Sequence, residues 1–467
     1  MSGLPEARCV PCFPADLAEP GARGALALAA GFTAEAGATL LVVEDGEPTL
    51  LIGCGDPADL TQHILRDAFG AAGRALSHLG SVAVDLAAIG PEILETDARD
   101  RAAAEGLVLG GYAFDAHRAD RRVRTSWIPA AETPAWRRGL AVAAAVNAAR
   151  DIVNEPANTA TPRGIADHIV ALAERSGLGV TVRDEDWLRS QGAGGILAIG
   201  SGSAERPLLV ELTHEGDDGE VDLCLVGKGV AFDAGGLSLK PPSDIMLMQY
   251  DMAGAAAVAH AMSLLPLVAP SLHVRAYLPL VENLPGPNAT RPGDIVSAHD
   301  GTTIEILNTD FEGRVIMADA LSFAAEAHPR HLVDMATLTA GAVNALGRRT
   351  AALFGSGPAP DIVARAALAT AEAVWPLPMP EHLMPTIRSR VADLKNFPYE
   401  TTARAGTAAM FLREFVPAGS SWAHIDMGGP GWTDEAYGVN PVGATGWGVR
   451  LLLQIFDLLL HDDPREP

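Results

Sequence analysis

Lysine is almost missing from this chain of 467 residues, although the chain contains 34 basic residues. It occurs only as Lys228, Lys240 and Lys395, so arginine carries nearly all of the positive charge. An arginine keeps its proton in a protein, whereas a lysine can become a neutral amine when it is buried or bound to a metal. Two of the three lysines fall within residues 226–254. We therefore take that stretch as the first candidate for a functional site.

Cysteine is scarce as well, with four residues in the whole chain. So few cysteines do not make a disulfide framework in a chain of this length. Cys9 and Cys12 form a single CxxC, a pattern shared by redox pairs and by half of a zinc knuckle. Because no second pair follows, we expect two reduced thiols near a mobile terminus.

Positive charge is in deficit, with a net charge of -24 and an isoelectric point near 4.8. A general affinity for nucleic acid or for anionic membranes requires a positive field, so we expect neither partner. No apolar run reaches the roughly 18 residues of a membrane span. The first thirty residues also lack a basic segment followed by an apolar core and a cleavage site. We therefore expect a cytoplasmic protein.

A small α/β domain is predicted for residues 1–132. Hydrophobic residues make up 48% of the chain, and its length predicts two or three domains. Two β-rich runs flank Asp45 and Gly46, a dipeptide typical of hairpins. They are followed by helical and strand-like patterns near 60–76, 81–86 and 98–105. A long alanine-rich helix that begins at Pro134 predicts a linker over residues 133–155.

A larger α/β domain is predicted for residues 156–467, because strand-like and helical runs alternate there. This alternation predicts a mixed, mainly parallel sheet flanked by helices on both faces. In such sheets, sites lie at the carboxyl ends of strands. We predict helices near 162–175, 253–265 and after 310, and strands near 180–182, 196, 208–212, 221–226, 274–280, 304–307, 331–336 and 422–427.

Four carboxylates lie near strand-to-helix junctions of the larger domain: Asp233, Asp251, Asp310 and Glu312. If they converge, they repel one another and raise each other's pKa unless cations hold them. Oxygen ligands of this kind suit two divalent ions about 3.5 to 4 Å apart that share an activated water. Lys228 could join them as a neutral amine ligand.

Other interpretations remain open on the residues alone. The segment 308–314 is equally consistent with a capped helix start whose acidic residues complement the helix dipole. A two-metal phosphoesterase uses similar carboxylates but has no evident use for a lysine ligand. The motifs HExxH, GxSxG and GxxxxGK[ST] are absent, which excludes the commonest zinc, serine and P-loop sites.

Three blocks of sequence resemble the signature of the leucyl aminopeptidase family, the cytosolic two-metal peptidases. The blocks are VGKGVAFDAGGLSLK, YDMAGAA and NTDFEGR. Their spacing agrees too, since Asp251 lies 23 residues after Lys228 and Asp310 lies 59 residues after Asp251. The resemblance covers most of the chain from Arg150 onward, whereas the first domain matches only around GLVLGGYAFD. Some members of the family also bind DNA, a role that the charge of -24 disfavours.

The resemblance implies a metal centre with two divalent ions, zinc or manganese, with magnesium or cobalt as alternatives. Asp233 and Glu312 would bridge the ions, and Asp310 would add its main-chain carbonyl to the second site. The implied ligands are Lys228, Asp233, Asp251 and Glu312 for one ion and Asp233, Asp310 and Glu312 for the other.

The same resemblance implies the removal of N-terminal residues from peptides by an activated water. Lys240 would stabilise the oxyanion, and Arg314 would hold a bicarbonate ion that acts as general base. Family members are hexamers whose sites face an interior cavity, so a homohexamer is expected. The implied substrate-binding residues are Met248, Asn308, Phe311, Thr337, Leu338 and Ala340.

The chain departs from the family pattern at three places. Gln249 stands where lysine is usual, in a position that is not a ligand. Phe311 replaces the usual alanine, and its ring could narrow the pocket for the residue after the cleaved bond. Ala340 and Gly341 follow Thr339 in place of the usual Gly-Ala, where the backbone helps to seat substrate and bicarbonate. We expect these changes to alter substrate preference and to leave the metal centre intact.

Overall fold

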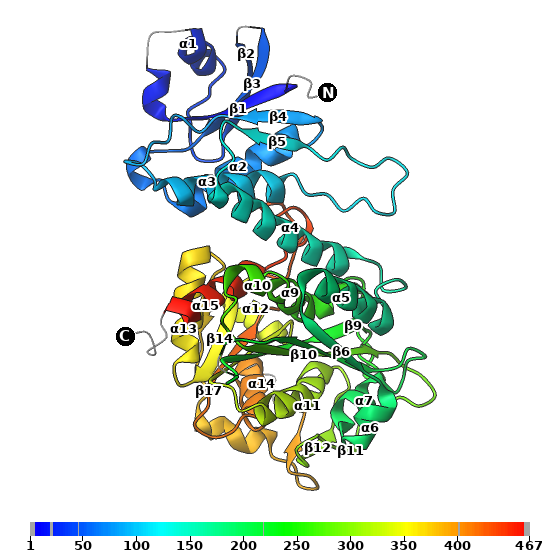
Figure 1. Cartoon of the computed structure of the whole chain (residues 1–467). Coiled ribbons are helices and arrows are strands. Elements are labelled where there is room, and N and C mark those ends of the chain that lie inside the picture. The colour runs from blue at the N-terminus through cyan, green and yellow to red at the C-terminus, as the bar shows by residue number, and fades with distance from the viewer. Residues whose placement is uncertain (1–4, 19–21, 45, 218, 400–401, 462–467) are drawn as a thin grey trace. The chain divides into compact units, whose positions relative to one another are not determined.

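The computed structural model describes residues 5–18, 22–44, 46–217, 219–399 and 402–461. The chain folds into two compact units. The first unit comprises the described residues within Met1–Asn147 together with Thr433–Gly443, and the second comprises the described residues within Ala148–Trp432 and from Ala444 onward. Both units combine helices and strands, as Figure 1 shows, so the predicted α/β class is confirmed.

The first unit is built on a five-stranded sheet. Its strands run in the order β2-β3-β1-β4-β5. The predicted hairpin is confirmed, since β2 and β3 are antiparallel, whereas Asp45 at its turn lies outside the described residues. The remaining neighbours are parallel. The bounds are β1 (Ala7–Cys12), β2 (Thr39–Glu44), β3 (Glu47–Gly53), β4 (Ser81–Val84), β5 (Ser126–Pro129), η1 (Pro14–Leu17), α1 (Ala22–Ala29), η2 (Pro57–Asp59), α2 (Gln62–Leu76) and α3 (Thr96–Gly110).

Glycines allow α2 and α3 to pack in close contact. A Cβ atom added to Gly110 would lie 2.0 Å from the carbonyl oxygen of Gly70, so a larger residue at this crossing would force the two helices apart. The later segment 433–443 closes the same unit. The Arg74 side chain donates a 2.6 Å hydrogen bond to the carbonyl of Gly438.

Cys9 and Cys12 lie in a different setting from the one expected. Both are buried on β1 and neither forms a disulfide. Burial raises the pKa of the Cys9 thiol to about 12, so this thiol is protonated at neutral pH. The reduced state is as predicted, and the two thiols lie on a strand that is paired on both sides, with β3 and β4. The expected mobile terminus falls on residues 1–4, outside the described residues, and stays a prediction.

The predicted linker helix is present as α4 (Pro134–Asn154). The division between the two units falls within it, between Asn147 and Ala148. The proposed boundaries at 1–132, 133–155 and 156–467 stay a prediction.

The second unit is built on a nine-stranded mixed sheet in the order β15-β14-β17-β13-β8-β10-β7-β6, with β9 also paired to β10. The central strands β17, β13, β8 and β10 are mutually parallel, as predicted, whereas β14, β7 and β6 introduce antiparallel pairs. The strands are β6 (Gly179–Arg183), β7 (Leu208–His214), β8 (Leu223–Gly227), β9 (Gly229–Asp233), β10 (Val274–Asn283), β13 (His331–Ala336), β14 (Ala351–Ser356), β15 (Val374–Pro376) and β17 (Ser421–Asp426).

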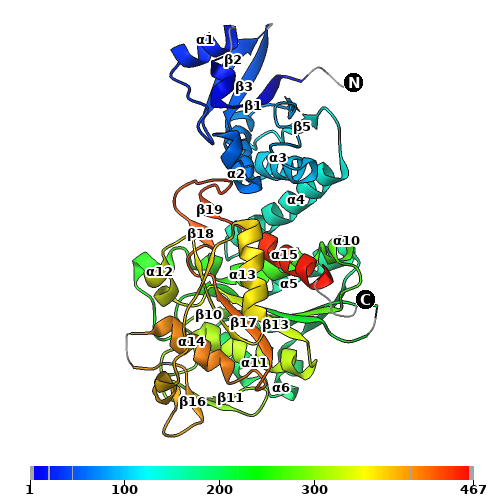
Figure 2. The same ribbon diagram turned by 90° about the vertical axis from the view of Figure 1, so that its left-hand side faces the viewer.

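Helices cover both faces of this sheet. Figure 1 shows α5, α9 and α10 on one side of β10 and α11 on the other, and Figure 2 shows α13 beside α15. The helices are α5 (Pro162–Ser176), α6 (Glu185–Ser190), α7 (Gly194–Gly200), α8 (Pro242–Ile245), η3 (Met248–Met252), α9 (Ala253–Met262), α10 (Leu265–Val268), α11 (Glu312–Glu326), α12 (Ala340–Leu346), α13 (Ala359–Thr370), η4 (Glu381–Ile387), α14 (Arg404–Arg413) and α15 (Val449–His461).

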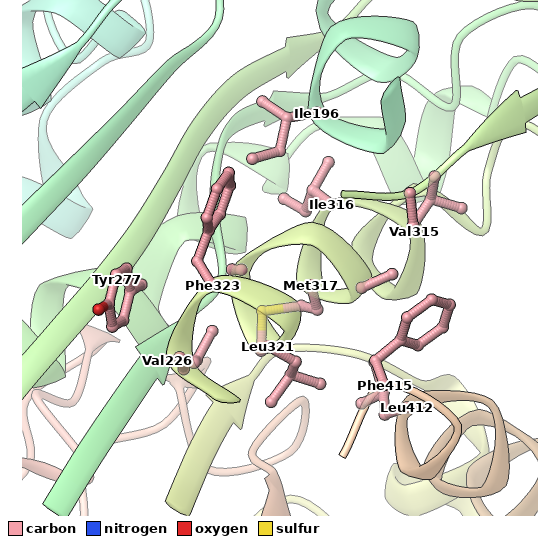
Figure 3. Packing of buried hydrophobic residues seen from close by; sticks show 14 of the residues in the cluster. Ile196, Val226, Tyr277, Val315, Ile316, Met317, Leu321, Phe323, Leu412 and Phe415 are labelled. Atoms are coloured by element: carbon pink, nitrogen blue, oxygen red, sulfur yellow. The ribbon is translucent and has the colours of Figure 1, made fainter. Parts of the chain in front are cut away.

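The core of the second unit surrounds α11. Thirteen consecutive residues at its start, 312–324, are buried, so the helix is enclosed on all sides. Figure 3 shows its side chains among Ile196 of α7, Val226 of β8 and Tyr277 of β10. Because this helix begins at Glu312, the tightly packed core fixes the position of the predicted site residues at its first turn.

The strand predicted near Ile196 is wrong, because this segment is the helix α7. A short buried apolar run fits a strand and a helix equally well by pattern. Here the N–H of Ile196 donates a 2.7 Å hydrogen bond to the carboxylate of Asp319 on α11, and such a contact is not visible in the local sequence.

Two small sheets complete the second unit and its boundary. One contains β11 (Asp294–Ser297), β12 (Thr303–Ile306) and β16 (Leu394–Lys395), and the other pairs β18 (Trp432–Thr433) with β19 (Gly443–Ala444). Within the described ranges, no helix has both the length and the apolar character needed to cross a bilayer.

Asp319 provides a test of the packing around α11. Its buried carboxylate accepts hydrogen bonds from the N–H groups of Ile196 and His299, and burial raises its pKa from 3.8 to about 7. Between these values the folded state keeps a proton that the unfolded state has lost. This group therefore lowers the free energy of unfolding as the pH rises, by at most about 1.4 kcal/mol per pH unit.

We predict that this pH dependence disappears in Asp319→Asn. Denaturant unfolding at a series of pH values measures the difference in unfolding free energy between the wild type and the variant. The difference should fall as the pH rises from about 4 to 7. The exposed Asp300→Asn controls for the loss of one acidic residue. A constant difference for Asp319→Asn over that range contradicts the prediction.

Candidate metal centre

Lys228 lies in the break between two strands of the large sheet. β8 ends at Gly227 and β9 begins at Gly229, and both pair in parallel with β10. The Lys228 N–H donates to the carbonyl of Met335 on β13, and the Lys228 carbonyl accepts from the N–H of Ala255 on α9. The backbone of Lys228 is therefore held by elements on two sides. Its side chain extends into the site from the carboxyl end of the central strand β8.

The Lys228 amine is surrounded by oxygen atoms. Its Nζ lies 2.8 Å from Asp251 Oδ2 and 2.8 Å from Glu312 Oε1, and it donates a 2.9 Å hydrogen bond to the carbonyl of Thr337. The hydroxyl of Thr337 donates in turn to Asp251 Oδ1 at 2.7 Å. Lys228 is only 2% exposed, so these charges meet out of contact with bulk water.

Lys240 holds the other carboxylates of the site. Its Nζ lies 2.8 Å from Asp233 Oδ2 and 2.6 Å from Asp310 Oδ1. Asp233 closes β9, and its Oδ1 accepts hydrogen bonds from the N–H of Gly235 and from the side-chain amide of Asn283. Two neutral donors and one cation thus fix the orientation of this carboxylate.

The segment from Asn308 to Arg314 brings the remaining acidic residues to the same place. It follows β12, which belongs to the small three-stranded sheet and not to the large one, so the two motifs come from different sheets. The side-chain oxygen of Asn308 accepts a 2.8 Å hydrogen bond from the N–H of Asp310. The Thr309 hydroxyl donates to the carbonyl of Gly235, which ties the two motifs together.

Asp233, Asp310 and Glu312 form a group that could hold a metal ion. One oxygen from each lies within 4.8 Å of the others. Carboxylate oxygens are the ligands that manganese and magnesium prefer, and zinc accepts them as well. Together with Asp251, these residues make four carboxylates, which face the two ammonium groups of Lys228 and Lys240. Negative charge is therefore in excess. The residues present therefore fit divalent cations.

The electrostatics of the group agree with this fit. Burial, together with Glu312 and Asp251, raises the pKa of Asp233 well above its ordinary value. Burial also raises the pKa of Asp310. Carboxylates that are this hard to ionise gain most from a nearby cation, because a cation offsets both the desolvation and the mutual repulsion.

Lys228 is an ammonium group in the arrangement described. Burial alone would lower its pKa, but Asp251, Glu312 and Asp233 outweigh that effect and raise the pKa above its ordinary value. The neutral amine predicted from the sequence requires a cation that replaces the proton. That ligand role stays a prediction.

Arg314 lies beside the carboxylates in a small cavity of about 130 Å³. Its side chain is buried, and burial lowers its pKa to about 10. In the described part of the chain, its Nε and Nη1 atoms have no hydrogen-bond partner. The guanidinium lies 4.7 Å from the centre of the Phe311 ring. Buried donors without acceptors are costly, so the cavity favours an anion that would accept from them.

The predicted substrate residues occupy several positions. Phe311, Leu338 and Ala340 line the cavity, as does Lys240. Thr337 contacts Lys228 and Asp251 instead, and Asn308 supports the backbone of Asp310. Met248 is half-buried on η3, the short helix that carries Asp251, and is not among the residues that line the cavity.

Sequence reasoning missed three residues of the site. Asn283, at the end of β10, donates a 2.8 Å hydrogen bond to Asp233 and so orients this carboxylate. Thr339 lines the cavity, and its hydroxyl donates a 2.6 Å hydrogen bond to Asp426. Arg404 also lines the cavity, and nothing in its local sequence indicates a role.

Residues 147–453 match the model of the catalytic domain of the cytosol aminopeptidase family, and residues 23–121 match that of its N-terminal domain. The chain belongs to the cytosol aminopeptidase family. The resemblance to leucyl aminopeptidases is confirmed, and the N-terminal match extends it into the region where the sequence resemblance was vague. The chain is therefore a peptide hydrolase, a metal-dependent aminopeptidase.

Relatives with similar names support this membership. The chain is 40% identical to a probable cytosol aminopeptidase of Micrococcus luteus over 429 residues, which cover 87% of this chain and 83% of that protein. It is also 40% identical to a probable cytosol aminopeptidase of Nocardia farcinica over 421 residues, which cover 87% of this chain and 82% of that protein.

Solved structures agree in fold. The bottromycin maturation enzyme BotP in complex with Mn is 39% identical and has a TM-score of 0.90, with 98% of this chain and 100% of that chain covered. The cytosol aminopeptidase from Coxiella burnetii is 31% identical and has a TM-score of 0.86, with 97% and 96% covered. The similarity thus extends over nearly the whole chain.

We predict that Asp233→Asn weakens the binding of divalent metal by at least about 100-fold. The amide keeps the shape of the side chain and an oxygen for the N–H of Gly235, but it removes the negative charge. Calorimetric titration of the metal-free protein with MnCl₂ measures the effect. Asp294→Asn, which removes a carboxylate paired with Arg291 at the surface, is the matched control. Equal affinities in all three proteins would contradict the assignment.

Proposed function

We propose that this protein removes N-terminal residues from peptides at a centre of two divalent metal ions, with bicarbonate as general base. The observation that carries the proposal is the convergence of Asp233, Asp310 and Glu312 beside two lysines in a member of an aminopeptidase family. Lys228, Asp233, Asp251 and Glu312 would hold one ion, and Asp233, Asp310 and Glu312 the other. When bound, such ions polarise a carbonyl group and activate water.

Lys240 acts on the carbonyl oxygen of the peptide in this proposal. Its ammonium group lies within the cavity lining, between Asp233 and Asp310. Burial disfavours its charged form, but Asp233, Glu312 and Asp310 raise its pKa above the ordinary value, so it stays charged. A fixed cation at this position stabilises negative charge that develops on the oxygen during attack.

Arg314 holds the base. Its two unpaired donors lie in the same cavity as Lys240, and bicarbonate offers oxygens that could accept from both. Bicarbonate held there would take the proton from the attacking water. No histidine is among the described residues that line this cavity, and its carboxylates Asp310 and Glu312 are proposed metal ligands, which leaves the task of general base to the bicarbonate.

The ions, the compartment and the assembly follow the family expectation. The manganese in the BotP complex makes manganese a first choice, with zinc, magnesium and cobalt as alternatives. We further propose a cytoplasmic homohexamer that acts on peptides and has neither membrane nor nucleic acid as a partner.

We predict that Lys240→Ala retains bound metal but loses about 100-fold to 1,000-fold in kcat. The change removes the cation that would stabilise the oxyanion and none of the carboxylates. Hydrolysis of leucine p-nitroanilide with added zinc or manganese measures the activity, and elemental analysis measures the metal. Lys395→Ala, which removes the one lysine far from the site in sequence, is the control.

Two outcomes would count against the proposed function. If the wild type cleaves p-nitrophenyl phosphate in preference to the anilide, the site is that of a phosphoesterase. If Lys240→Ala is fully active, Lys240 does not stabilise the transition state.

We predict that Phe311→Ala broadens the acceptance of bulky second residues. The Phe311 ring lines the cavity and packs edge-on against Phe397 at 4.9 Å, so it takes up space next to two proposed ligands. The relative kcat/KM values of Leu-Gly, Leu-Leu and Leu-Phe measure the effect. In the variant, kcat/KM should rise most for Leu-Phe. If the ratios of kcat/KM among the three dipeptides are the same as in the wild type, the prediction is refuted.

A further inference from the structure

Arg404 is a cation of the site that the proposed chemistry leaves without a task. It is the first residue of α14, and its guanidinium lies 5.8 Å from the centre of the Phe311 ring, against which Arg314 also lies. Its Nε atom is buried and has no hydrogen-bond partner in the described ranges. It also forms no ion pair with a described carboxylate. The residue as a whole is half-buried. A buried arginine donor is normally satisfied, so the Nε atom points to a missing acceptor.

Arg404 stands at the junction of two cavities. The inner cavity of about 130 Å³ is lined by Lys240, Asp310 and Arg314, and by Arg404 itself. The outer cavity of about 590 Å³ shares only Ala340 and Arg404 with the inner one. By volume the inner cavity has room for about four water molecules, which is the space of a small residue.

The backbone at the start of α14 adds donors to the same junction. Its N-cap residue Ala403 has no side chain that could satisfy the first N–H groups of the helix. Ala403, Ala405 and Gly406 line the outer cavity together with Arg404. The positive end of the helix dipole favours a negatively charged group there.

We propose that Arg404 binds the C-terminal carboxylate of short peptides and makes this protein selective for dipeptides. The inference rests on the proposed aminopeptidase function. The residue after the cleaved bond lies in the inner cavity beside Phe311, and its carboxylate meets the guanidinium of Arg404 at the exit. An arginine fork matches the two oxygens of a carboxylate, so a free acid is held better than an amide or an ester.

Longer peptides have to pass the same residue. In a tripeptide the group that reaches Arg404 is a neutral peptide bond, and the remaining residue enters the outer cavity. The charge-assisted hydrogen bond is then lost. A competing role for Arg404 is to hold the proposed bicarbonate together with Arg314, and this role predicts no distinction between a free acid and an amide.

The test compares substrates within one protein preparation. Leu-Gly and Leu-Gly-amide share the cleaved bond and differ only in the terminal carboxylate. In the wild type we expect kcat/KM for the free acid to exceed that for the amide by about tenfold to a hundredfold. In Arg404→Gln the ratio should fall to near one, and Arg404→Lys should restore part of it. Because both substrates are measured with the same preparation, the ratio of their kcat/KM values does not depend on the fraction of the variant that is correctly folded.

The outcomes separate the inference from the proposed function. If neither substrate is cleaved by the wild type, the aminopeptidase proposal fails. If both are cleaved with ratios that are the same in wild type and Arg404→Gln, the carboxylate role is overturned. An equal loss on both substrates that added bicarbonate reverses also overturns it, in favour of the competing role. Arg206→Gln, which removes an exposed guanidinium paired with Glu185, is the matched control and should keep the wild-type ratio.

Discussion

The site depends on the compensation of buried charge. Asp233, Asp251 and Glu312 are each only a few per cent exposed, and without partners such carboxylates would not stay ionised in a packed interior. The two lysines supply part of the compensation, and they flank β9, with Lys228 just before this strand and Lys240 in the loop after it. The positions of the two lysines therefore determine which carboxylates are neutralised, because moving either lysine would leave a carboxylate without its ion pair.

Much of this arrangement was predictable from the sequence. The strand β13 has the predicted bounds. The residues that the sequence singled out also meet, since Lys228 contacts Asp251, and Asp233 lies with Asp310 and Glu312. The errors have a common physical origin. Ile196 is helical because Asp319, 123 residues away, accepts its N–H, and β12 belongs to a separate sheet because it pairs with β11 and β16. Such long-range partners leave no local pattern.

The same reason explains the residues that were missed. Asn283 and Arg404 reach the site from elements 50 and 94 residues away from Asp233 and Asp310, and each is ordinary within its own segment. Phe311, by contrast, was recognised in the sequence as a departure from the family pattern, which has alanine at this position. The structure shows which residues lie next to its ring. Arg314 and Arg404 both lie against its ring. Among the described residues neither guanidinium forms an ion pair, and the aromatic face stabilises both cations.

The segment 433–443 has a consequence for biosynthesis. It belongs to the first unit, where Gly438 accepts a hydrogen bond from Arg74, although the rest of that unit precedes residue 148. A ribosome that adds residues at the usual rate needs roughly 15 to 60 s to travel from one part to the other. During this interval the nascent first unit lacks its closing segment, so the order in which the chain emerges does not match the order in which its units can be finished.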